Sequence, residues 1–217
     1  MLCRRLFVGV GVLVFAGLGS ATGAGADDVP DNVSQHSHNA YAFGAWQFDE
    51  PNGSTGITVQ VSDEFTVASH GLKFRATSVC VGIAHIDESE RDDGFDFVWG
   101  CKELDKSEFD FDSRLDDAFV STSVPVECIA SGECIASPDR VHLELSWTGG
   151  DSLVVTNGVS RGEECHFHRR DEYRQDMEVR GSVSDGDTDL TRGVAGAGAM
   201  EKLYRTALVV DEPSDCS

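Results

Sequence analysis

The sequence predicts an all-β protein: one antiparallel β-sandwich of about nine strands, stapled by disulfides and preceded by an N-terminal signal peptide. Short runs in which apolar and polar residues alternate recur along the chain and are separated by turn sequences. No long segment shows a convincing helical period. Strands at short intervals without long helices are typical of an antiparallel sandwich or barrel.

The first 26 residues predict export. Arg4 and Arg5 precede an apolar run over residues 6–18, and small residues lead up to Ala26. This is the pattern of a cleaved secretory signal, and the run is shorter than the ~20 residues that a membrane-spanning helix needs. Residues 4–8 also resemble a twin-arginine export signal, so that route and general secretion both stay open. We therefore expect a secreted, extracellular protein whose mature chain has no membrane span.

The chain is strongly acidic. It has 38 acidic and 17 basic residues and a net charge of −21. Loss of residues 1–26 removes two arginines, which changes the charge to −23 (−21 − 2). Such a surface repels nucleic acid and anionic membranes. Lysine is scarce, which favours adaptation to concentrated salt over the alternative of an ordinary acidic secreted protein.

Cysteine usage agrees with export, because six cysteines remain after Cys3 leaves with the signal. Six cysteines allow fifteen pairings, and only one has a physical argument: cross-strand register favours Cys80 with Cys101. The pair Cys128–Cys134 would close a short loop, and Cys165–Cys216 follows by elimination. A structural zinc site is the weaker interpretation, since no two cysteines have CxxC spacing.

The fold core is expected in a hairpin formed by residues 72–87 and 95–101. Pairing Ile86 with Phe95 sets Ala84 opposite Phe97, Gly82 opposite Trp99 and Cys80 opposite Cys101. Small residues then lie beside large aromatic ones, and the two sulfurs meet. The other face pairs Ile83 with Val98 and His85 with Asp96, where a cross-strand ion pair is expected.

The other elements follow in order. Residues 27–39 are polar and predict a flexible arm, and residues 40–217 predict a single domain. Strands are expected over 40–48, around 57–61, at 109–111, over 118–130 with Pro125 at an edge or bulge, over 141–147, at 153–155 and over 177–183. A charged stretch spans 161–174, and residues 200–210 suit either a strand or a helix.

Residues 141–210 resemble exported bacterial β-sandwich proteins of no known activity. The resemblance rests on Leu-Ser-Trp-Thr-Gly at 145–149 and Gly-Ser-Val-Ser-Asp-Gly at 181–186. It implies the fold class and brings no function with it.

The most suggestive chemical pattern is His166-Phe-His168. In a strand both imidazoles project from one face, as two ligands of a transition metal such as zinc do. The run resembles the metal-binding strand of alpha carbonic anhydrases, but that family takes a third histidine from downstream, and this chain has none after His168. His85 or His142 can complete a site only if the fold brings them near. The alternative is a pair of solvated histidines beside carboxylates.

Asp185, Asp187 and Asp189 recur at every second position, as carboxylates around calcium often do. The EF-hand glycine and glutamate are missing, so an acidic β-turn is the competing interpretation. His85 opposite Asp96 lacks a GxSxG-type elbow for nucleophilic catalysis. Nothing singles out two carboxylates for sugar hydrolysis.

These patterns favour a secreted, non-enzymatic interaction or surface module with an unknown extracellular partner and no required cofactor. A metal-binding protein or metalloenzyme that uses His166 and His168 is the first alternative. A secreted hydrolase with paired carboxylates is the second.

Overall fold

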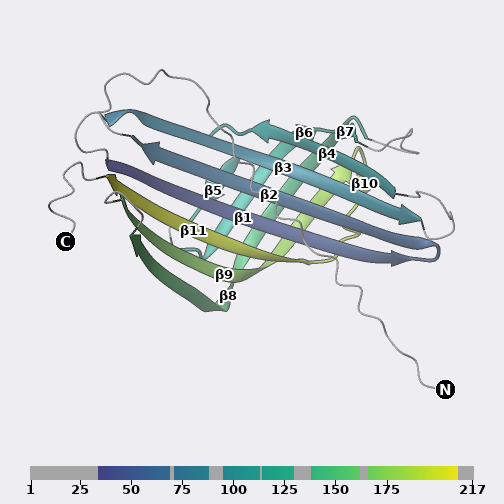
Figure 1. Cartoon of the computed structure of the whole chain (residues 1–217). Coiled ribbons are helices and arrows are strands. Elements are labelled where there is room, and N and C mark those ends of the chain that lie inside the picture. The colour runs from purple at the N-terminus through teal and green to yellow at the C-terminus, as the bar shows by residue number, and fades with distance from the viewer. Residues whose placement is uncertain are drawn as a thin grey trace. The chain divides into compact units, whose positions relative to one another are not determined.

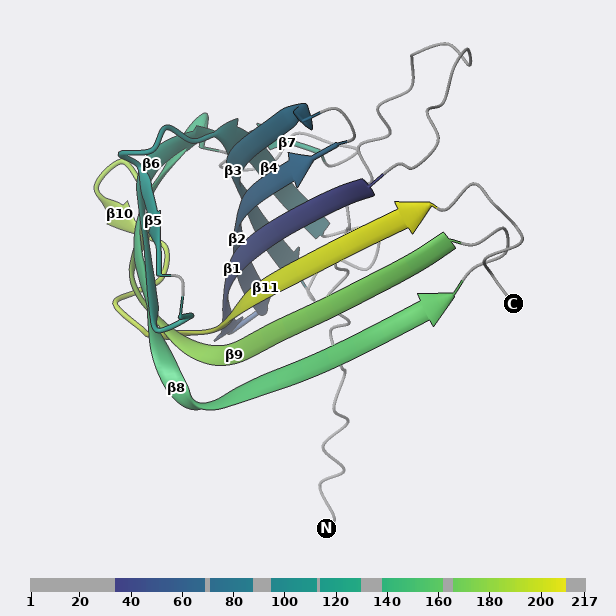
Figure 2. The same ribbon diagram turned by 90° about the vertical axis from the view of Figure 1, so that its left-hand side faces the viewer.

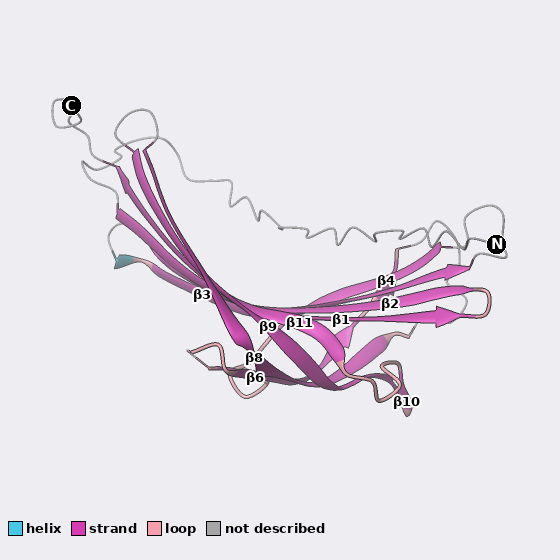
Figure 3. Cartoon of the chain, turned by 90° about the horizontal axis from the view of Figure 1, so that it is seen from below, coloured by secondary structure: helices cyan, strands magenta, loops and turns pink. Residues whose placement is uncertain are grey.

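Almost all of the described chain is β-strand (Figure 3). The computed structural model describes residues 34–68, 71–87, 95–112, 114–129, 138–161 and 166–209. Figure 1 labels the strands within these ranges: β1 (Ser34–Glu50), β2 (Gly53–Val67), β3 (Lys73–Asp87), β4 (Phe95–Glu103), β5 (Phe109–Phe111), β6 (Asp117–Pro125), β7 (Glu127–Cys128), β8 (Arg140–Arg161), β9 (His166–Asp185), β10 (Thr188–Asp189) and β11 (Gly196–Val209).

The strands belong to one open antiparallel sheet. Their order is β5-β6-β8-β9-β11-β1-β2-β3-β4-β7, and β10 pairs with β9. The all-β antiparallel prediction is confirmed, but the described strands number eleven instead of about nine, and they form one sheet where a sandwich has two. The physical reason is the pairing of the first and last strands, β1 with β11, which joins the N-terminal and C-terminal halves through one hydrogen-bond ladder.

The predicted hairpin is confirmed in its exact register. β3 and β4 pair Ile86 with Phe95, Gly82 with Trp99 and Cys80 with Cys101. A Cβ at Gly82 would lie 3.0 Å from Trp99 Cε3, so the glycine makes room for the indole. The cysteine sulfurs form a disulfide, with Cα atoms 4.1 Å apart.

One apolar core lies on one face of the bent sheet. It draws buried side chains from β1, β2, β3, β4, β6, β8, β9 and β11, including Trp46, Val59, Val81, Val120 and Trp147. In the first half of β8 every second residue, from Val141 to Trp147, is buried, as the alternation predicts. Trp147 also donates its indole N–H to the Phe43 carbonyl oxygen at 2.8 Å, which ties β8 to β1.

The long strands extend beyond this core. Figure 2 shows β8 and β9 bending, with β8, β9, β11 and β1 continuing side by side. The β8–β9 ladder has a register irregularity between Gly149 and Leu153. From Leu153 to Ser160 every side chain is exposed, so this part of β8 has no covering layer among the described residues. We call this extension the outer half-sheet: residues 34–41, 62–67, 73–77, 153–161, 166–174 and 201–209.

Two expectations at the ends of the chain change. β1 begins at Ser34, so residues 34–39 of the expected arm are strand, because they pair with β11 on one side and, from His36, with β2 on the other. Residues 196–209 form strand β11, which resolves the choice between strand and helix. No helix in the described ranges is long and apolar enough to cross a membrane.

Candidate functional site

The predicted metal ligands lie in the outer half-sheet. His166 pairs with Val209 of β11, and His168 lies between Ala207 of β11 and Ser160 of β8. The expected third ligands are distant in the sheet. His142 lies near the opposite end of β8, and His85 lies at the opposite end of the sheet, where Thr55 is its partner in β2. The sheet therefore brings neither histidine to His166 and His168.

No cluster of three or more histidine, cysteine or carboxylate groups suited to a metal occurs among the described residues. The His85 ring instead contacts the Thr55 hydroxyl at 3.0 Å, and Glu50 Oε2 lies 3.9 Å from it. His85 is also opposite Asp96 in the register, as predicted. A metal site at His166 and His168 stays a prediction.

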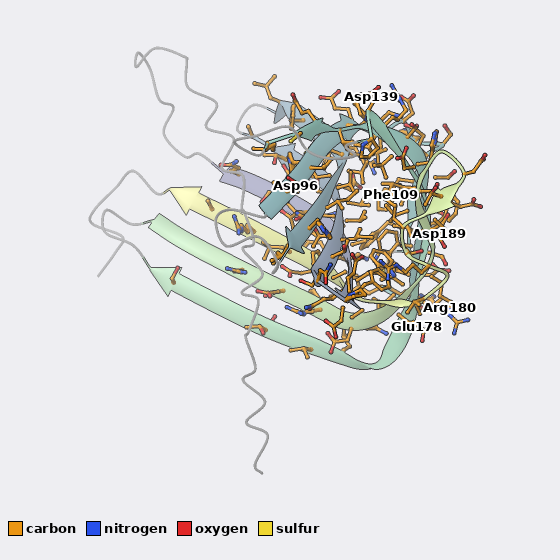
Figure 4. The ribbon with its side chains drawn as sticks, turned by 90° about the vertical axis from the view of Figure 1, so that its right-hand side faces the viewer. Asp96, Phe109, Asp139, Glu178, Arg180 and Asp189 are labelled. Carbon is orange, nitrogen blue, oxygen red and sulfur yellow. A yellow bond between two sulfur atoms is a disulfide. The ribbon has the colours of Figure 1, made fainter. Side chains whose placement is uncertain are left out.

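The acidic run at the end of β9 forms a turn in which Asp189 organises the following loop (Figure 4). The Asp189 carboxylate accepts hydrogen bonds from the Thr191 hydroxyl at 2.6 Å, the Thr191 amide at 2.9 Å and the Gly193 amide at 2.8 Å. Burial raises the pKa of Asp189, but these hydrogen bonds outweigh burial and lower it overall. Asp185 and Asp187 are exposed. Calcium binding stays a prediction, and the carboxylate of Asp189 already serves as a loop cap.

Of the four cysteines in the other two predicted disulfides, the structure describes only Cys128. Cys128 is disulfide-bonded. Cys134, Cys165 and Cys216 lie outside the described residues, so the pairs Cys128–Cys134 and Cys165–Cys216 stay predictions.

A hollow that the sequence did not predict lies on the outer half-sheet, on the same face as the core. One part, of about 360 Å³, is lined by Arg169, Asp171, Tyr173, Tyr204 and Thr206. A second part, of about 200 Å³, shares the two tyrosines and adds Arg114, Leu115, Leu153 and Lys202. We call the two parts together the tyrosine–arginine hollow.

Register explains why these side chains converge. Tyr173 is opposite Lys202, Asp171 is opposite Tyr204, and Arg169 is opposite Thr206 in the β9–β11 ladder. Directly opposite residues in an antiparallel pair share a face, and alternate residues along a strand return to it. Met200, a core residue on β11, is therefore on the same face as Lys202, Tyr204 and Thr206.

The two tyrosines that line both parts of the hollow belong to a cluster of packed aromatic rings. The Tyr204 ring lies parallel to the His38 imidazole, with centroids 4.5 Å apart and an interplanar angle of 3°. Tyr173 meets Tyr204 edge-on at 5.9 Å. Burial lowers the pKa of His38, and the charge of Lys202 lowers it further, while the charge of Asp63 opposes this shift. His38 Nε2 is buried without a hydrogen-bond partner in the described structure.

Cations gather around these rings although the chain carries a charge of −21. Arg169 and Arg114 are exposed, and Arg169 Nε lies 2.8 Å from the Asp171 carboxylate. Lys202 is only 5% exposed, with its ammonium 5.4 Å from the Phe111 ring centroid. Burial lowers the pKa of Lys202, while Asp112 opposes that shift. The hollow thus combines aromatic faces with guanidinium donors.

Asp63 on β2, whose charge raises the pKa of His38, is already paired with another group. Asp63 is opposite Ala40 on β1 and accepts hydrogen bonds from Arg75 at 2.7 and 2.9 Å and from Thr77 at 2.9 Å. Burial raises the pKa of Asp63, but the hydrogen bonds from Arg75 and Thr77 lower it overall. The charge of Asp63 is therefore matched locally by Arg75.

Comparison with known proteins assigns no family. No protein-family profile matches the chain, and no curated protein matches it. A crystal structure from Nitrosomonas europaea, provisionally assigned as AttH, is similar over 81% of this chain with 11% identity and a TM-score of 0.31. The chain spans about half of that structure, 52% of its length. A likeness this distant carries no argument about this chain.

Proposed function

We propose that the protein is an exported, non-catalytic interaction module that binds an anionic ligand carrying a flat ring or sugar face in the tyrosine–arginine hollow. One observation carries the proposal: in a strongly acidic chain, Tyr173 and Tyr204 line two adjoining hollows, of which one has Arg169 and the other has Arg114 in its wall. The rings offer apolar faces for stacking, and the guanidinium groups offer paired donors that match a carboxylate.

The charge distribution supports selectivity for such a ligand. Most of the surface repels an anion at a distance, so an anion is retained only where cations are close together and aromatic contact adds to the attraction. Asp171 and the Thr206 hydroxyl, which also lies 3.2 Å from His36 Nδ1, supply acceptors for ligand hydroxyl groups. This combination favours a polyhydroxylated acid, such as an acidic saccharide.

Action outside the cytoplasm is part of the proposal. A disulfide between Cys80 and Cys101 persists best in an oxidising compartment, which agrees with the predicted signal segment.

Isothermal titration of the purified protein with trigalacturonate, neutral maltotriose and 2-naphthoate tests the proposal. Trigalacturonate should bind more tightly than maltotriose, because only the former presents carboxylates to the arginines. The Arg114→Gln/Arg169→Gln variant should weaken that binding about tenfold, since each of the two lost charge-assisted contacts is worth roughly 0.7 kcal/mol at an exposed site and about 1.4 kcal/mol corresponds to a factor of ten.

Arg140→Gln/Arg180→Gln is the matched control, because both arginines are exposed and neither lines the hollow. It should bind as the unaltered protein does. Preference for 2-naphthoate over trigalacturonate would assign the site to aromatic acids. Absence of binding by both acids, or equal losses in the two double variants, would refute the proposal.

A further inference from the structure

The second half of β8 is an open edge of the sheet. Residues 142–148 of β8 pair with β6 on one side and β9 on the other, but among the described strands residues 153–161 pair only with β9. Figure 2 shows this part of β8 as the outermost long strand on its side of the sheet. An open edge presents unpaired backbone N–H and C=O groups to any extended chain that can approach.

Most of this edge lacks two of the features that normally prevent pairing, charged residues and proline. Residues 153–160 (Leu-Val-Val-Thr-Asn-Gly-Val-Ser) contain no charged residue and no proline. Leu153, Val154, Val155 and Val159 are between 47% and 77% exposed. The open edge of β3 beyond its pairing with β4 differs, because it carries Lys73 and Arg75. Charged residues of that kind protect an edge against association.

We propose that the β8 edge pairs antiparallel with the same edge of a second copy, which forms a two-fold symmetric dimer through one continuous sheet. The neutral edge is what favours a second copy. Two chains of charge −21 repel one another over most of their surfaces, and an uncharged strand lets their backbones approach without opposing like charges.

Full overlap of the uncharged residues 154–160 fixes the register, with Asn157 on the two-fold axis. Val155 then lies opposite Val159 of the second copy, and the symmetry repeats that pair. Val155 and Val159 are opposite Tyr173 and Arg169 of β9, so they share the face of the tyrosine–arginine hollow. Because the axis of such a pair is perpendicular to the sheet, the two hollows face the same way on either side of the junction.

A dimer with two hollows on one face can bind a repetitive ligand or surface at two points, which raises avidity. The dimer does not depend on the proposed ligand, since it rests on the edge of β8 and not on the contents of the hollow.

Sedimentation equilibrium of the purified protein in 0.1 M and 2 M sodium chloride tests the proposal. The dimer fraction should rise with salt, because screening weakens repulsion between the two acidic copies. Val155→Lys/Val159→Lys places two lysines opposite two lysines across the axis and should raise the dissociation constant about tenfold or more. Ile129→Lys/Val194→Lys adds the same charge at two other exposed apolar residues and should leave dimerisation intact.

Register is tested separately by Asn157→Cys. Opposite Cα atoms in an antiparallel pair are about 4.5–5.5 Å apart, within the range of a disulfide, so this variant should cross-link to itself under mild oxidation. Val194→Cys should not. A protein that stays monomeric at both salt concentrations, or a dimer that the edge lysines leave unchanged, would overturn the proposal. A dimer that Asn157→Cys fails to cross-link would overturn the register.

Discussion

Glu108 joins three segments of the described chain through one carboxylate. It accepts hydrogen bonds from the Lys102 ammonium at 2.5 Å, the Thr122 hydroxyl at 2.6 Å and the Asp105 amide at 3.0 Å. The hydrogen bond from Lys102 is the largest cause, and together these donors lower the pKa of Glu108 from 4.5 to about 2. The ionised form is therefore stabilised in the folded protein.

Glu108→Gln should lower the free energy of unfolding by about 1–2 kcal/mol at neutral pH, because hydrogen bonds to a charged group are lost at a partly exposed site. The folded pKa is depressed, so this stabilisation is fully present well above pH 4.5, declines as pH falls toward 2, and is lost below the folded pKa. Urea unfolding of both proteins between pH 7 and pH 2.5 measures the difference.

Glu103→Gln is the matched control, since it removes the same charge from an exposed position on β4. It separates the loss of specific hydrogen bonds from the general relief of repulsion in an acidic chain. An equal change in both variants, or a Glu108→Gln effect that does not shrink with falling pH, would contradict this role for Glu108.

The tyrosine–arginine hollow could not be predicted from the sequence, for a physical reason. Tyr173 and Tyr204 are 31 positions apart (204 − 173), and only the β9–β11 register places them together. Arg169 and Asp171 lie in residues 169–174, where every residue except Tyr173 is charged. A possible signal was alternation within that stretch: residues 169, 171 and 173 share the face of the hollow, while Arg170, Glu172 and Arg174 share the other.

At the scale of elements, the sequence was sufficient to predict a strand and its register where one face of the strand is buried. The β3–β4 register followed from matching small residues with large ones, and the half-buried pattern of residues 141–147 was confirmed. β8 and β9 were underestimated because the second half of β8 is exposed and the first half of β9, which pairs with it, is rich in charged residues, so no apolar period marks them as strand. Hydrogen bonding to neighbouring strands, which a single segment does not encode, extends them.

The disulfide is the element-scale feature most open to measurement. Cys80 and Cys101 are 21 positions apart, and closing a loop of this size restricts the unfolded chain by about 3 kcal/mol. Cys80→Ala/Cys101→Ala should lower the free energy of unfolding by roughly that amount, as measured in urea. Each single variant serves as a control, because it loses the same bridge but leaves a free thiol. A double variant as stable as the unaltered protein would show that the β3–β4 ladder alone restricts the loop.

The charge of the whole molecule sets its response to salt. With 38 acidic and 17 basic residues, at least 21 acidic groups have no basic counterpart. Described ion pairs such as Arg75–Asp63 and Lys102–Glu108 match individual carboxylates but cannot change this excess. Mutual repulsion among the unmatched groups opposes the compact state, and it is greatest at low ionic strength.

We expect the protein to become more stable as sodium chloride rises from 0.1 M to above 1 M at neutral pH. The screening length falls from ~10 Å to ~3 Å, which weakens repulsion between exposed carboxylates while the core and the disulfide are unaffected. For a chain of this size each kcal/mol gained raises Tm by about 2–4 °C. Chloride is preferred to sulfate, because sulfate strengthens apolar burial by itself.

Dimerisation also stabilises a folded protein and also rises with salt, so the two effects must be separated. Melting curves of the Val155→Lys/Val159→Lys variant at low protein concentration report the monomer alone, and its Tm should still rise with sodium chloride. At mildly acid pH, where more carboxylates are protonated, the rise should be smaller. A Tm that stays flat or falls across this range would mean that repulsion is too weak to oppose folding even at low salt. Salt adaptation would then be excluded, and the acidity would be a solubility property.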